Sequence, residues 1–460
     1  MSKRAKRGAN ARGGRAVRTA SAAEQRVLEA ALKAYRTSKA VLAAAHDPVS
    51  SARAFEAVFA ATDEVAQTIV KAAEEALADD EEPAEFRDAD RRFVRVLHSE
   101  RTLHSTRGPI RVRRALYRDA AARNSPTRCP YDERRGVMPG GYLPGLGKAV
   151  VKAVARMPAA AAADLLADAT GHRLALTTMK DLTAAVGAAL RGEADARFAC
   201  VFAHDAVPAA ARTLVICADG IHVPIRVEGY KQAMVATLTF LDADGVRLDT
   251  IYLGEMPEAG KAAIMARVKA EVAAILRQRP DLQTEVVIDG AKDLREHLVA
   301  LFPDALHVTD FFHVIEHVAA ALQLLFPTDD ARRHAERTRW CHALKHEVGT
   351  ADRLHAWLWA AAARADEPLT RWAREQVEGH AEYVFGQRDF LIYPQAANDG
   401  MALGSGVVEA GCKTLATQRL KVSGAKWSRD GGAAILHLRE LLLSDRFERA
   451  FAFHQAGYAA

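Results

Sequence analysis

The chain has 460 residues, of which 50% are hydrophobic and 26% are charged, with a formal net charge of +5. This length and ordinary composition predict two or three compact units, and the absence of an 18-residue apolar run excludes a membrane-spanning helix and a membrane partner. Five scattered cysteines fit a reducing cytoplasm rather than a disulfide framework or a C-x-x-C zinc site. The basic N-terminus is not followed by the apolar segment of a secretory signal, so we do not expect one.

Positive charge is concentrated in two segments of the chain. Residues 1–20 contain seven Lys or Arg and no acid, and residues 107–128 contain seven Arg against one acid, Asp119. Such clusters suit a polyanion, because neutralising phosphates releases counterions and supplies most non-specific affinity for nucleic acid. The alternatives are a solvated tail and a charged strand face. We expect a basic disordered tail over 1–20. The candidate DNA contacts of the second segment are Arg111, Arg113 and Arg114.

Two helices are predicted in the N-terminal helical region, 21–90. The apolar residues at helical spacing are Leu28, Ala31, Leu32 and Tyr35 in the first helix and Phe55, Val58, Phe59, Thr62, Ala66 and Ile69 in the second. Each helix therefore has one apolar face, and we expect the pair to pack together or against a partner subunit. The acidic stretch 78–90 is expected to be a linker.

Residues 91–150 and 151–195 are predicted to form two further modules. The first alternates apolar and polar residues around a Gly-Pro, which indicates a basic β-hairpin followed by a Gly/Pro-rich loop at 137–147. The second has two short helices around a glycine-containing turn, with Thr177 or Thr178 able to cap the second helix. That is the layout of a DNA-binding helix-turn-helix, with Lys180 as its candidate contact, but simple packing of two helices gives the same pattern.

After residue 194 the hydrophobic period changes to that of an α/β fold. Three strands at 213–256 are followed by an amphipathic helix at 259–280, and then strand and helix alternate up to 312. This is the order of an RNase H-like mixed sheet. The predicted boundaries are 205–325 for the first part of this core, 326–400 for a helical insertion, 401–446 for the remainder of the core and 447–460 for a tail.

Two aspartates follow apolar strand residues in this core. Asp219 ends VICADG and Asp289 ends VVIDG, and for either one alone a simple Asp-Gly turn is an adequate explanation. If the two strands are neighbours, however, the carboxylates lie about one strand spacing apart, roughly 4.8 Å. Carboxylates that close repel each other unless a cation lies between them, and oxygen ligands without Cys or His favour Mg²⁺ or Mn²⁺.

A third acid, Glu409, stands alone in GSGVVEAGCKTLATQRLK (404–421). With Ser405 as N-cap, Glu409 lies just beyond the first turn of a helix, where the helix dipole favours its ionised form. Lys413, Ala416 and Leu420 are expected to share its face, so that the acid points towards the sheet. An i,i+4 ion pair between Glu409 and Lys413 is the alternative.

The histidines of DFFHVIEHV allow three interpretations. His313 and His317 are four residues apart with Glu316 between them, which resembles one half of a zinc hydrolase site, although the order is H-x-x-E-H. We favour a supporting role for Asp310, His313 and His317 beside the carboxylates, where they buttress a metal site or contact the scissile phosphate. Ordinary packing is the third possibility.

These motifs together resemble a known family. GSGVVEAGCKTLATQRLKVSGAKWS (404–428), with VIDGAKDL, DFFHVIEHV and LGEMPEAGK, is similar to the ISKra family of bacterial insertion-sequence DDE transposases, which are related to the Mutator-like group. The resemblance runs over about 92–446 and is densest over 211–325 and 391–445. It implies that Asp219, Asp289 and Glu409 are the catalytic acids and metal ligands, and that Asp310 and His313 form a D-x-x-H motif. Relatives often carry a Cys pair after the arginine-rich strand, whereas only Cys129 stands near that place here.

The resemblance implies a metal-dependent transposase with two Mg²⁺ or Mn²⁺ ions, which cleaves double-stranded DNA at terminal inverted repeats and joins it to target DNA. It also implies a bacterial, cytoplasmic protein that acts as a homodimer or larger assembly, since two ends must be brought together. An RNase H-like nuclease without joining activity and a non-catalytic DNA-binding protein derived from a transposase are the alternatives. Trp427 is expected either to stack on an unpaired base or to belong to the core. The predicted phosphate contacts around it are Lys413, Arg419, Lys421 and Lys426.

Overall fold

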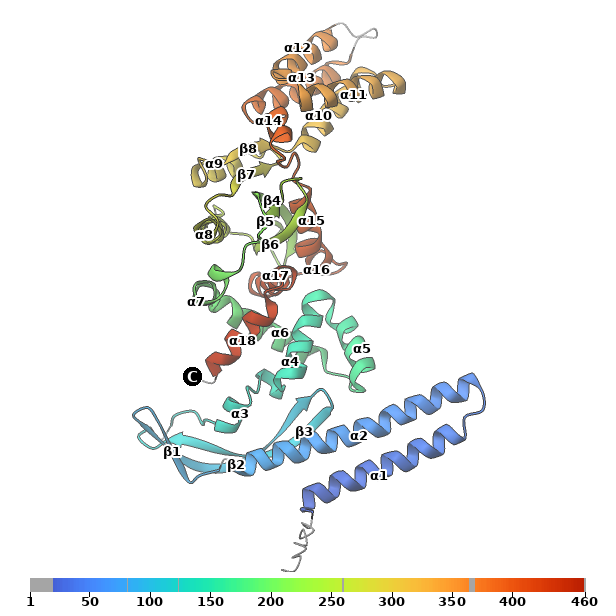
Figure 1. Ribbon diagram of the computed structural model, residues 1–460, viewed down its shortest axis with the longest axis vertical. Helices are drawn as coiled ribbons and strands as arrows, with labels where there is room; N and C mark the ends of the chain where they lie inside the picture. Colours follow the sequence, from blue (N-terminus) through green and yellow to red (C-terminus); the bar gives the residue numbers. More distant parts are fainter. Residues whose placement is uncertain (1–19, 81, 123, 259, 364–368, 459–460) are drawn as a thin grey trace, which may run out of the picture. The chain divides into compact units, whose positions relative to one another are not determined.

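The computed structural model describes residues 20–80, 82–122, 124–258, 260–363 and 369–458 (Figure 1). The chain divides into two compact units, Met1–Gly147 with Asp164–Leu174 and Lys148–Ala163 with Ala175–Ala460. Nearly all of the predicted basic tail lies outside the described ranges. None of the helices within those ranges combines the length and the apolar character that a membrane crossing requires.

The first unit begins with the two expected helices, α1 (Ala22–Ala43) and α2 (Pro48–Asp80). They form an antiparallel pair whose contact contains small buried residues such as Ala34 and Ala54, and Lys33 forms an ion pair with Glu64 across it. The large residues of the predicted apolar faces are not in this contact. The exposed ones are Leu28, Leu32, Tyr35, Phe55, Phe59 and Ile69.

The predicted basic hairpin is confirmed as β2 (Arg91–Ser105) and β3 (Gly108–Asp119), which pair antiparallel. A short strand, β1 (Glu85–Asp88), extends the sheet at β2. The acidic stretch 78–90 is therefore not a simple linker, because it contributes the end of α2 and all of β1. After the sheet come α3 (Pro130–Arg134), η1 (Pro139–Gly141) and the start of α4 (Pro144–Arg156), which lies partly in the predicted loop.

The two helices expected at 161–187 are α5 (Ala159–Thr170) and α6 (Leu176–Gly192). The N-cap of α6 is Ala175, which makes no side-chain cap, so capping by a threonine was wrong. Gly187 of α6 packs on α17 (Arg429–Leu443), where a Cβ atom would lie 2.7 Å from the Cβ atom of Ala434. Only glycine permits so close an approach, and α6 is consequently part of the second unit's core rather than an independent module.

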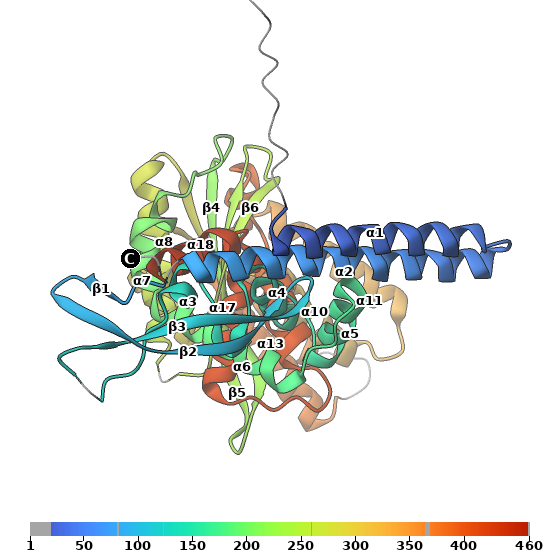
Figure 2. The same ribbon diagram turned by 90° about the horizontal axis from the view of Figure 1, so that it is seen from below.

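The second unit is built on a five-stranded mixed sheet, which confirms the α/β class. Its strands are β4 (Thr213–Ile225), β5 (Gly229–Leu241), β6 (Arg247–Glu255), β7 (Gln283–Ile288) and β8 (Leu306–Thr309). The spatial order is β6-β5-β4-β7-β8, with the first three strands antiparallel and the last two parallel to β4. β4 and β5 continue as a two-stranded hairpin beyond the end of β7 (Figure 2).

Helices cover both faces of this sheet. α8 (Ala262–Gln278) and α9 (Lys292–Leu301) pack on one face, in a core that includes Leu214, Ile216, Val268 and Leu294. The other face is covered by α15 (Gly406–Gly411), the π-helical η4 (Cys412–Thr417) and α17, with α16 (Gln418–Leu420) between them. α7 (Ala194–Cys200) and η2 (Phe202–His204) precede β4 in the chain.

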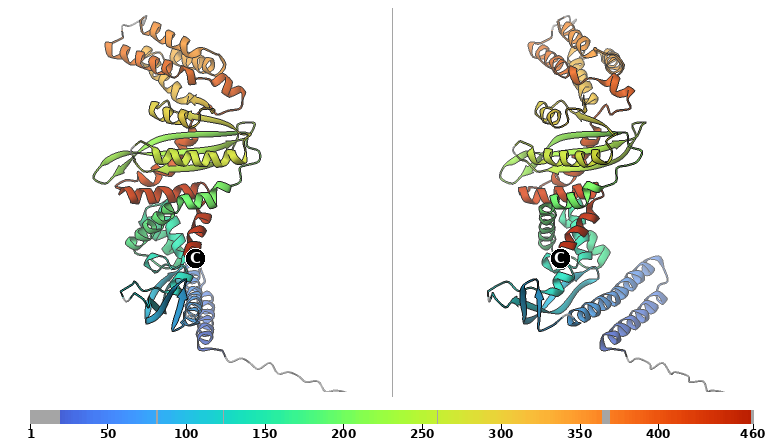
Figure 3. Two further views of the ribbon diagram at one scale, coloured as in Figure 1. Left: turned by 90° about the vertical axis from the view of Figure 1, so that its left-hand side faces the viewer. Right: turned by 60° about the vertical axis from the view of Figure 1, so that its left-hand side comes forward.

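The predicted helical insertion lies between β8 and α15. Its elements are α10 (Phe311–Leu325), α11 (Asp330–His346), α12 (Thr350–Ala363), α13 (Arg371–Gly386), η3 (Arg388–Phe390) and α14 (Tyr393–Asn398). They gather at the β8 side of the sheet (Figure 3). The predicted C-terminal tail is instead a helix, α18 (Phe447–Tyr458), whose Phe447 and Phe451 are buried and whose Glu448 forms ion pairs with Lys148 and Lys152 of α4.

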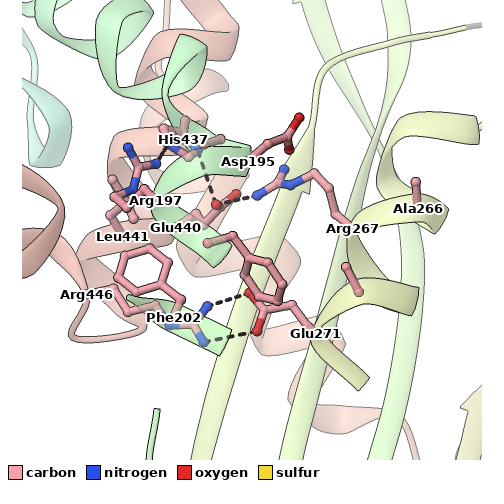
Figure 4. Close-up of a pocket in the computed structure, with 13 residues that line it drawn as sticks. Asp195, Arg197, Phe202, Ala266, Arg267, Glu271, His437, Glu440, Leu441 and Arg446 are labelled. Atoms are coloured by element: carbon pink, nitrogen blue, oxygen red, sulfur yellow. Dashed lines mark hydrogen bonds and ion pairs between the residues drawn. The ribbon is translucent and has the colours of Figure 1, made fainter. Parts of the chain in front are cut away.

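Buried charges surround a small cavity of about 140 Å³ between α7, α8 and α17 (Figure 4). The charged groups drawn there that form hydrogen bonds or ion pairs are Arg197, Arg267, Glu271, His437, Glu440 and Arg446. The Nε2 atom of His437 lies 2.9 Å from a guanidinium nitrogen of Arg197, which can only donate. His437 therefore carries its proton on Nδ1, 3.1 Å from Glu440.

We predict that Glu440→Ala lowers the free energy of unfolding by about 3–5 kcal/mol, because it removes the closest carboxylate partner of Arg267 and leaves only the more distant ion pair with Glu255 at 3.7 Å. It also removes the acceptor of the Gly254 amide, 3.2 Å away. Urea denaturation measures the change. Glu296→Ala is the matched control, since Glu296 is exposed on α9 and its loss should change stability by less than about 0.5 kcal/mol. Equal effects of the two substitutions would contradict a role for the buried pair.

Candidate active site

The two predicted aspartates lie on neighbouring parallel strand segments. The last residues that pair between β4 and β7 are Cys217 and Val287. Continuing this register by two residues brings Asp219 opposite Asp289, the residue that follows β7. Side chains alternate along a strand, so both carboxylates belong to the same face of the sheet. The predicted adjacency of the two strands is confirmed.

The prediction that Asp219 ends its strand was wrong. β4 continues past Asp219 to Ile225 because β5 remains its antiparallel partner along this whole length. Only the pairing with β7 stops, and this leaves the β7 side of Asp219 open at the level of the carboxylate. Asp219-Gly220 is therefore not a turn.

The helix that carries Glu409 covers the same face of the sheet, but the Glu409 side chain is exposed and does not point into that contact as predicted. Gly411, two residues further on, packs against Val235, and Val235 is the residue of β5 that pairs with Asp219. The thiol of Cys412 lies 3.5 Å from the Asp219 Oδ2 atom and donates to it. α15 thus lies over Asp219, with Glu409 one helical turn before Cys412.

The helix that bears Glu409 differs from the prediction in one respect. Ser405 is the N-cap residue as expected, but the α-helical geometry ends at Gly411 and a π-helical turn follows. The wider turn shifts the register after Gly411, so Ala416 and Leu420 are buried while Lys413 is exposed like Glu409, and the four residues do not share one inward face as predicted. Both Glu409 and Lys413 are described, and no ion pair joins them. The alternative of a simple Glu409–Lys413 pair is therefore not supported.

The pKa values of Asp219 and Glu409 reflect their burial and the carboxylates near them. Burial and the neighbouring carboxylate of Asp289 raise the pKa of Asp219, although the Gly220 amide acts in the opposite direction. Burial, followed by the charges of Asp310, Glu316 and Asp219, raises the pKa of Glu409. A bound cation would relieve this repulsion, because it favours the ionised form of each carboxylate.

Asp310 ties the segment before α15 to the end of β8. Its Oδ1 atom caps α10 by accepting from the amides of Phe312 at 2.6 Å and His313 at 3.1 Å. Its Oδ2 atom accepts from the Ser405 amide at 2.6 Å and from the Ser405 hydroxyl. Asp310 is 1% exposed and its oxygens are occupied by these donors, which is the geometry of a buttress.

The aromatic side chains behind the carboxylates form a stack that reaches α13. The His317 ring lies 3.7 Å from the parallel ring of Tyr383, and its Nδ1 atom is 3.0 Å from Nδ1 of His380. Burial and the two neighbouring histidines lower the pKa of His317 to about 4. The Tyr383 hydroxyl donates to the backbone carbonyl of Asp289 at 2.7 Å. A Cβ atom at Gly290, where φ is +95°, would lie 2.5 Å from that hydroxyl, so glycine is required for this contact.

No group of three or more His, Cys, Asp and Glu side chains within the described ranges is arranged to hold a metal ion. Of the two histidines interpreted as a possible zinc site, His317 contacts Tyr383 and His380, and His313 lies 3.6 Å from Glu316. The carboxylates of Asp219, Asp289 and Glu409 likewise do not form such a metal-holding group in this structure. Their chemistry nevertheless fits a hard divalent cation, since all three offer carboxylate oxygens and two have raised pKa values.

The predicted DNA contacts fall into two groups. Exposed ones without an ion pair in the described structure are Arg111, Arg113, Lys180, Lys413, Lys421 and Lys426. Arg114 is 6% exposed and lies 3.2 Å from Asp132, because it follows Arg113 and therefore points to the opposite face of β3. Arg419 is also 6% exposed and donates to the Val154 carbonyl at 2.9 Å. A phosphate contact by Arg114 or Arg419 is thus contradicted by burial.

Several residues at the site were missed in the sequence. Cys412, Tyr383, His380 and Glu285 contact the acids, their loops or the supporting histidines. Cys412 lies within the segment that identified Glu409 but was given no role, and the other three lie outside the motifs. The spacing of His380 and Tyr383 on one helical face was the only available signal, and it is common in packed helices. A comparison with known protein-family models found no match, and neither did a search of curated protein sequences.

Glu285 fixes the segment that leads into α15, from the same face of the sheet as Asp289. It is fully buried on β7, and its Oε2 atom accepts from the Ala402 amide at 2.9 Å. Within the described structure its Oε1 atom has no partner. Burial raises the pKa of Glu285 to about 8, so the folded protein holds this side chain protonated at neutral pH.

We predict that Glu285 makes stability fall as pH rises from about 4.5 to about 8, because over this window the folded chain binds a proton that the unfolded chain releases. Glu285→Gln removes this proton uptake. The melting temperature of the variant should match that of the unsubstituted protein near pH 4.5 and exceed it increasingly up to pH 8. Glu296→Gln, at an exposed position, should show no such trend. A pH-independent difference for Glu285→Gln would contradict the prediction.

Proposed function

We propose that the protein is a DDE transposase of an insertion sequence, which cleaves DNA at the element's ends and joins them to target DNA. Asp219, Asp289 and Glu409 are its catalytic acids. The proposal rests on one observation above all. Two aspartates on adjacent parallel strand segments share one face of the sheet, and the helix that carries the glutamate covers that face.

The topology supports an RNase H-like assignment of the second unit. Three antiparallel strands followed by two parallel ones, in the order β6-β5-β4-β7-β8, form the mixed sheet expected from the order of strands and helices. The helical insertion separates Asp289 from Glu409 in the chain. The resemblance of the segments around these acids to the ISKra family is independent support from the sequence.

Asp219, Asp289 and Glu409 would hold two Mg²⁺ or Mn²⁺ ions. When bound, such ions lower the pKa of a water molecule and offset the charge that develops on the leaving oxygen. The chemistry is in-line displacement at phosphorus. In the first step a water oxygen attacks phosphorus and the 3′-oxygen leaves as a hydroxyl. In the second step that 3′-hydroxyl loses its proton and attacks a target phosphodiester, and the 3′-oxygen of the target strand leaves and takes up a proton. No covalent link to the protein is needed, so positioning and charge are the chain's contribution.

The neighbouring residues position the acids. Asp310 fixes the start of α15 through Ser405, and Tyr383 holds the backbone carbonyl of Asp289. Both contacts involve backbone groups, so they constrain the loops that carry the acids while leaving the carboxylates free to bind. Lys413, one turn after Glu409 and exposed, is available to a phosphate of the substrate.

Two alternative functions follow from the same site. A nuclease that cleaves without joining would use identical carboxylates, and a DNA-binding protein derived from a transposase would retain them without using them. Joining is favoured by the resemblance, which includes the whole α15 segment. We also propose double-stranded DNA as the partner and a homodimer or larger assembly in the bacterial cytoplasm, because two DNA ends must be held together.

We predict that Asp289→Asn abolishes DNA cleavage and leaves duplex affinity within a few-fold, because the substitution removes a metal ligand charge but preserves volume and hydrogen bonding. The assay uses Mg²⁺, a target plasmid and labelled duplexes that carry the ends of the DNA segment encoding the protein. Joined products support a transposase, nicks alone support a nuclease, and binding without cleavage supports a non-catalytic protein.

Asp304→Asn is the matched control for this experiment. Asp304 is an exposed aspartate without a partner in the described structure, in the loop before β8, and its substitution should leave cleavage unchanged. Loss of duplex binding by Asp289→Asn would show that Asp289 has a structural role instead.

A further inference from the structure

A groove of about 620 Å³ in the second unit lies apart from the carboxylates. It is bounded by α6 on one side and by the loop before α17 on the other, and the end of β4 closes it. Its size falls within the range of about 300–1,000 Å³ that is typical of ligand sites. Alanine, proline and isoleucine side chains form much of its lining, and Asp181 is its one acidic residue.

Three cations line this groove without a partner. Lys180 comes from α6, Arg226 follows β4, and Lys426 lies in the loop before α17. All three are exposed, and within the described residues none of their side chains forms an ion pair or hydrogen bond. Segments far apart in the sequence thus place three free positive charges around one groove. This arrangement suits a ligand with several negative charges.

The groove also has a rigid aromatic wall. The Trp427 backbone pairs with the end of β4, where the Arg226 amide donates to the Trp427 carbonyl at 2.7 Å. The indole donates to the Leu420 carbonyl at 2.9 Å, and the buried guanidinium of Arg419 lies 4.9 Å from the ring centroid. Trp427 is therefore held in place before any ligand binds. An apolar floor beside an aromatic side chain accommodates a base, while the cations suit phosphates.

The groove is connected to the carboxylates by two structural elements. Along β4, the six residue steps from Asp219 to Ile225 span about 20 Å at roughly 3.3 Å per step. The segment from Glu409 to the groove carries the exposed Lys413 and Lys421. A distance of about 20 Å corresponds to about six base steps of duplex at 3.4 Å each.

We propose that this groove binds the DNA backbone about six nucleotides from the bond that is cut, with Lys180, Arg226 and Lys426 on phosphates and Trp427 beside a base. The inference rests on the proposed function, because it assumes that the acids act on DNA. The proposal gives α6 a role in holding the DNA on the second unit, rather than in an independent DNA-binding helix-turn-helix module.

The test compares two triple variants in the Asp289→Asn background, so that binding is measured without cleavage. One carries Lys180→Gln, Arg226→Gln and Lys426→Gln. The other carries Lys269→Gln, Arg277→Gln and Arg247→Gln, three exposed cations outside the groove without ion pairs in the described structure. The readouts are the salt dependence of duplex affinity and the hydroxyl-radical footprint.

The groove variant should lower the slope of log K against log[salt] by about 2.7, since each lost phosphate contact removes about 0.9. It should also lose footprint protection about six nucleotides from the cut site, while the control changes neither. An unchanged slope and footprint in the groove variant would overturn the proposal that the groove binds DNA, even if the unsubstituted protein cleaves DNA. If DNA binding depends on the groove cations but the unsubstituted protein does not cleave DNA, the proposed function is overturned and the groove is retained as a DNA-binding site. Circular dichroism verifies that both variants are folded.

Discussion

The parallel pairing of β4 with β7 is the constraint on which the candidate site depends. Because the register aligns Cys217 with Val287, the two aspartates that follow are opposite each other on one face of the sheet. Clustering carboxylates in a partly buried place is unfavourable, and the raised pKa values of Asp219 and Glu409 show that the fold tolerates this cost. A bound cation would relieve this repulsion, as the proposed function requires.

The remaining contacts at the site hold loops rather than carboxylates. Asp310 binds the backbone and side chain of Ser405, Tyr383 binds the backbone of Asp289, and Glu285 binds the backbone of Ala402. Each contact joins segments separated by about a hundred residues in the chain. The helical insertion is therefore more than an appendage, because its α13 carries Tyr383 and its ends are fixed by Asp310 and Glu285. In the groove, backbone hydrogen bonds likewise hold Trp427 against the end of β4.

Local patterns in the sequence were sufficient wherever a single element decided the outcome. The hairpin of β2 and β3, the alternation of strands and helices after residue 212, and the N-cap at Ser405 all follow from spacing and turn residues. Patterns failed where a neighbour decided. Asp219 lies inside a strand because β5 continues beside it, and residues 447–458 form a helix because Phe447 and Phe451 find a buried surface.

The sequence by itself determined the α/β class, and it indicated three candidate acids and their chemical type. Those properties follow from hydrophobic period and from the identity of side chains. Only the tertiary structure decided which charges are available. Arg419 and Lys421 are two residues apart, yet the first is buried against Val154 and Trp427 while the second is exposed. Two residues that far apart on a helix point in different directions, and the contact of Arg419 with the Val154 carbonyl decides which of them is buried. That contact joins segments 265 residues apart in the chain, so no local pattern encodes it.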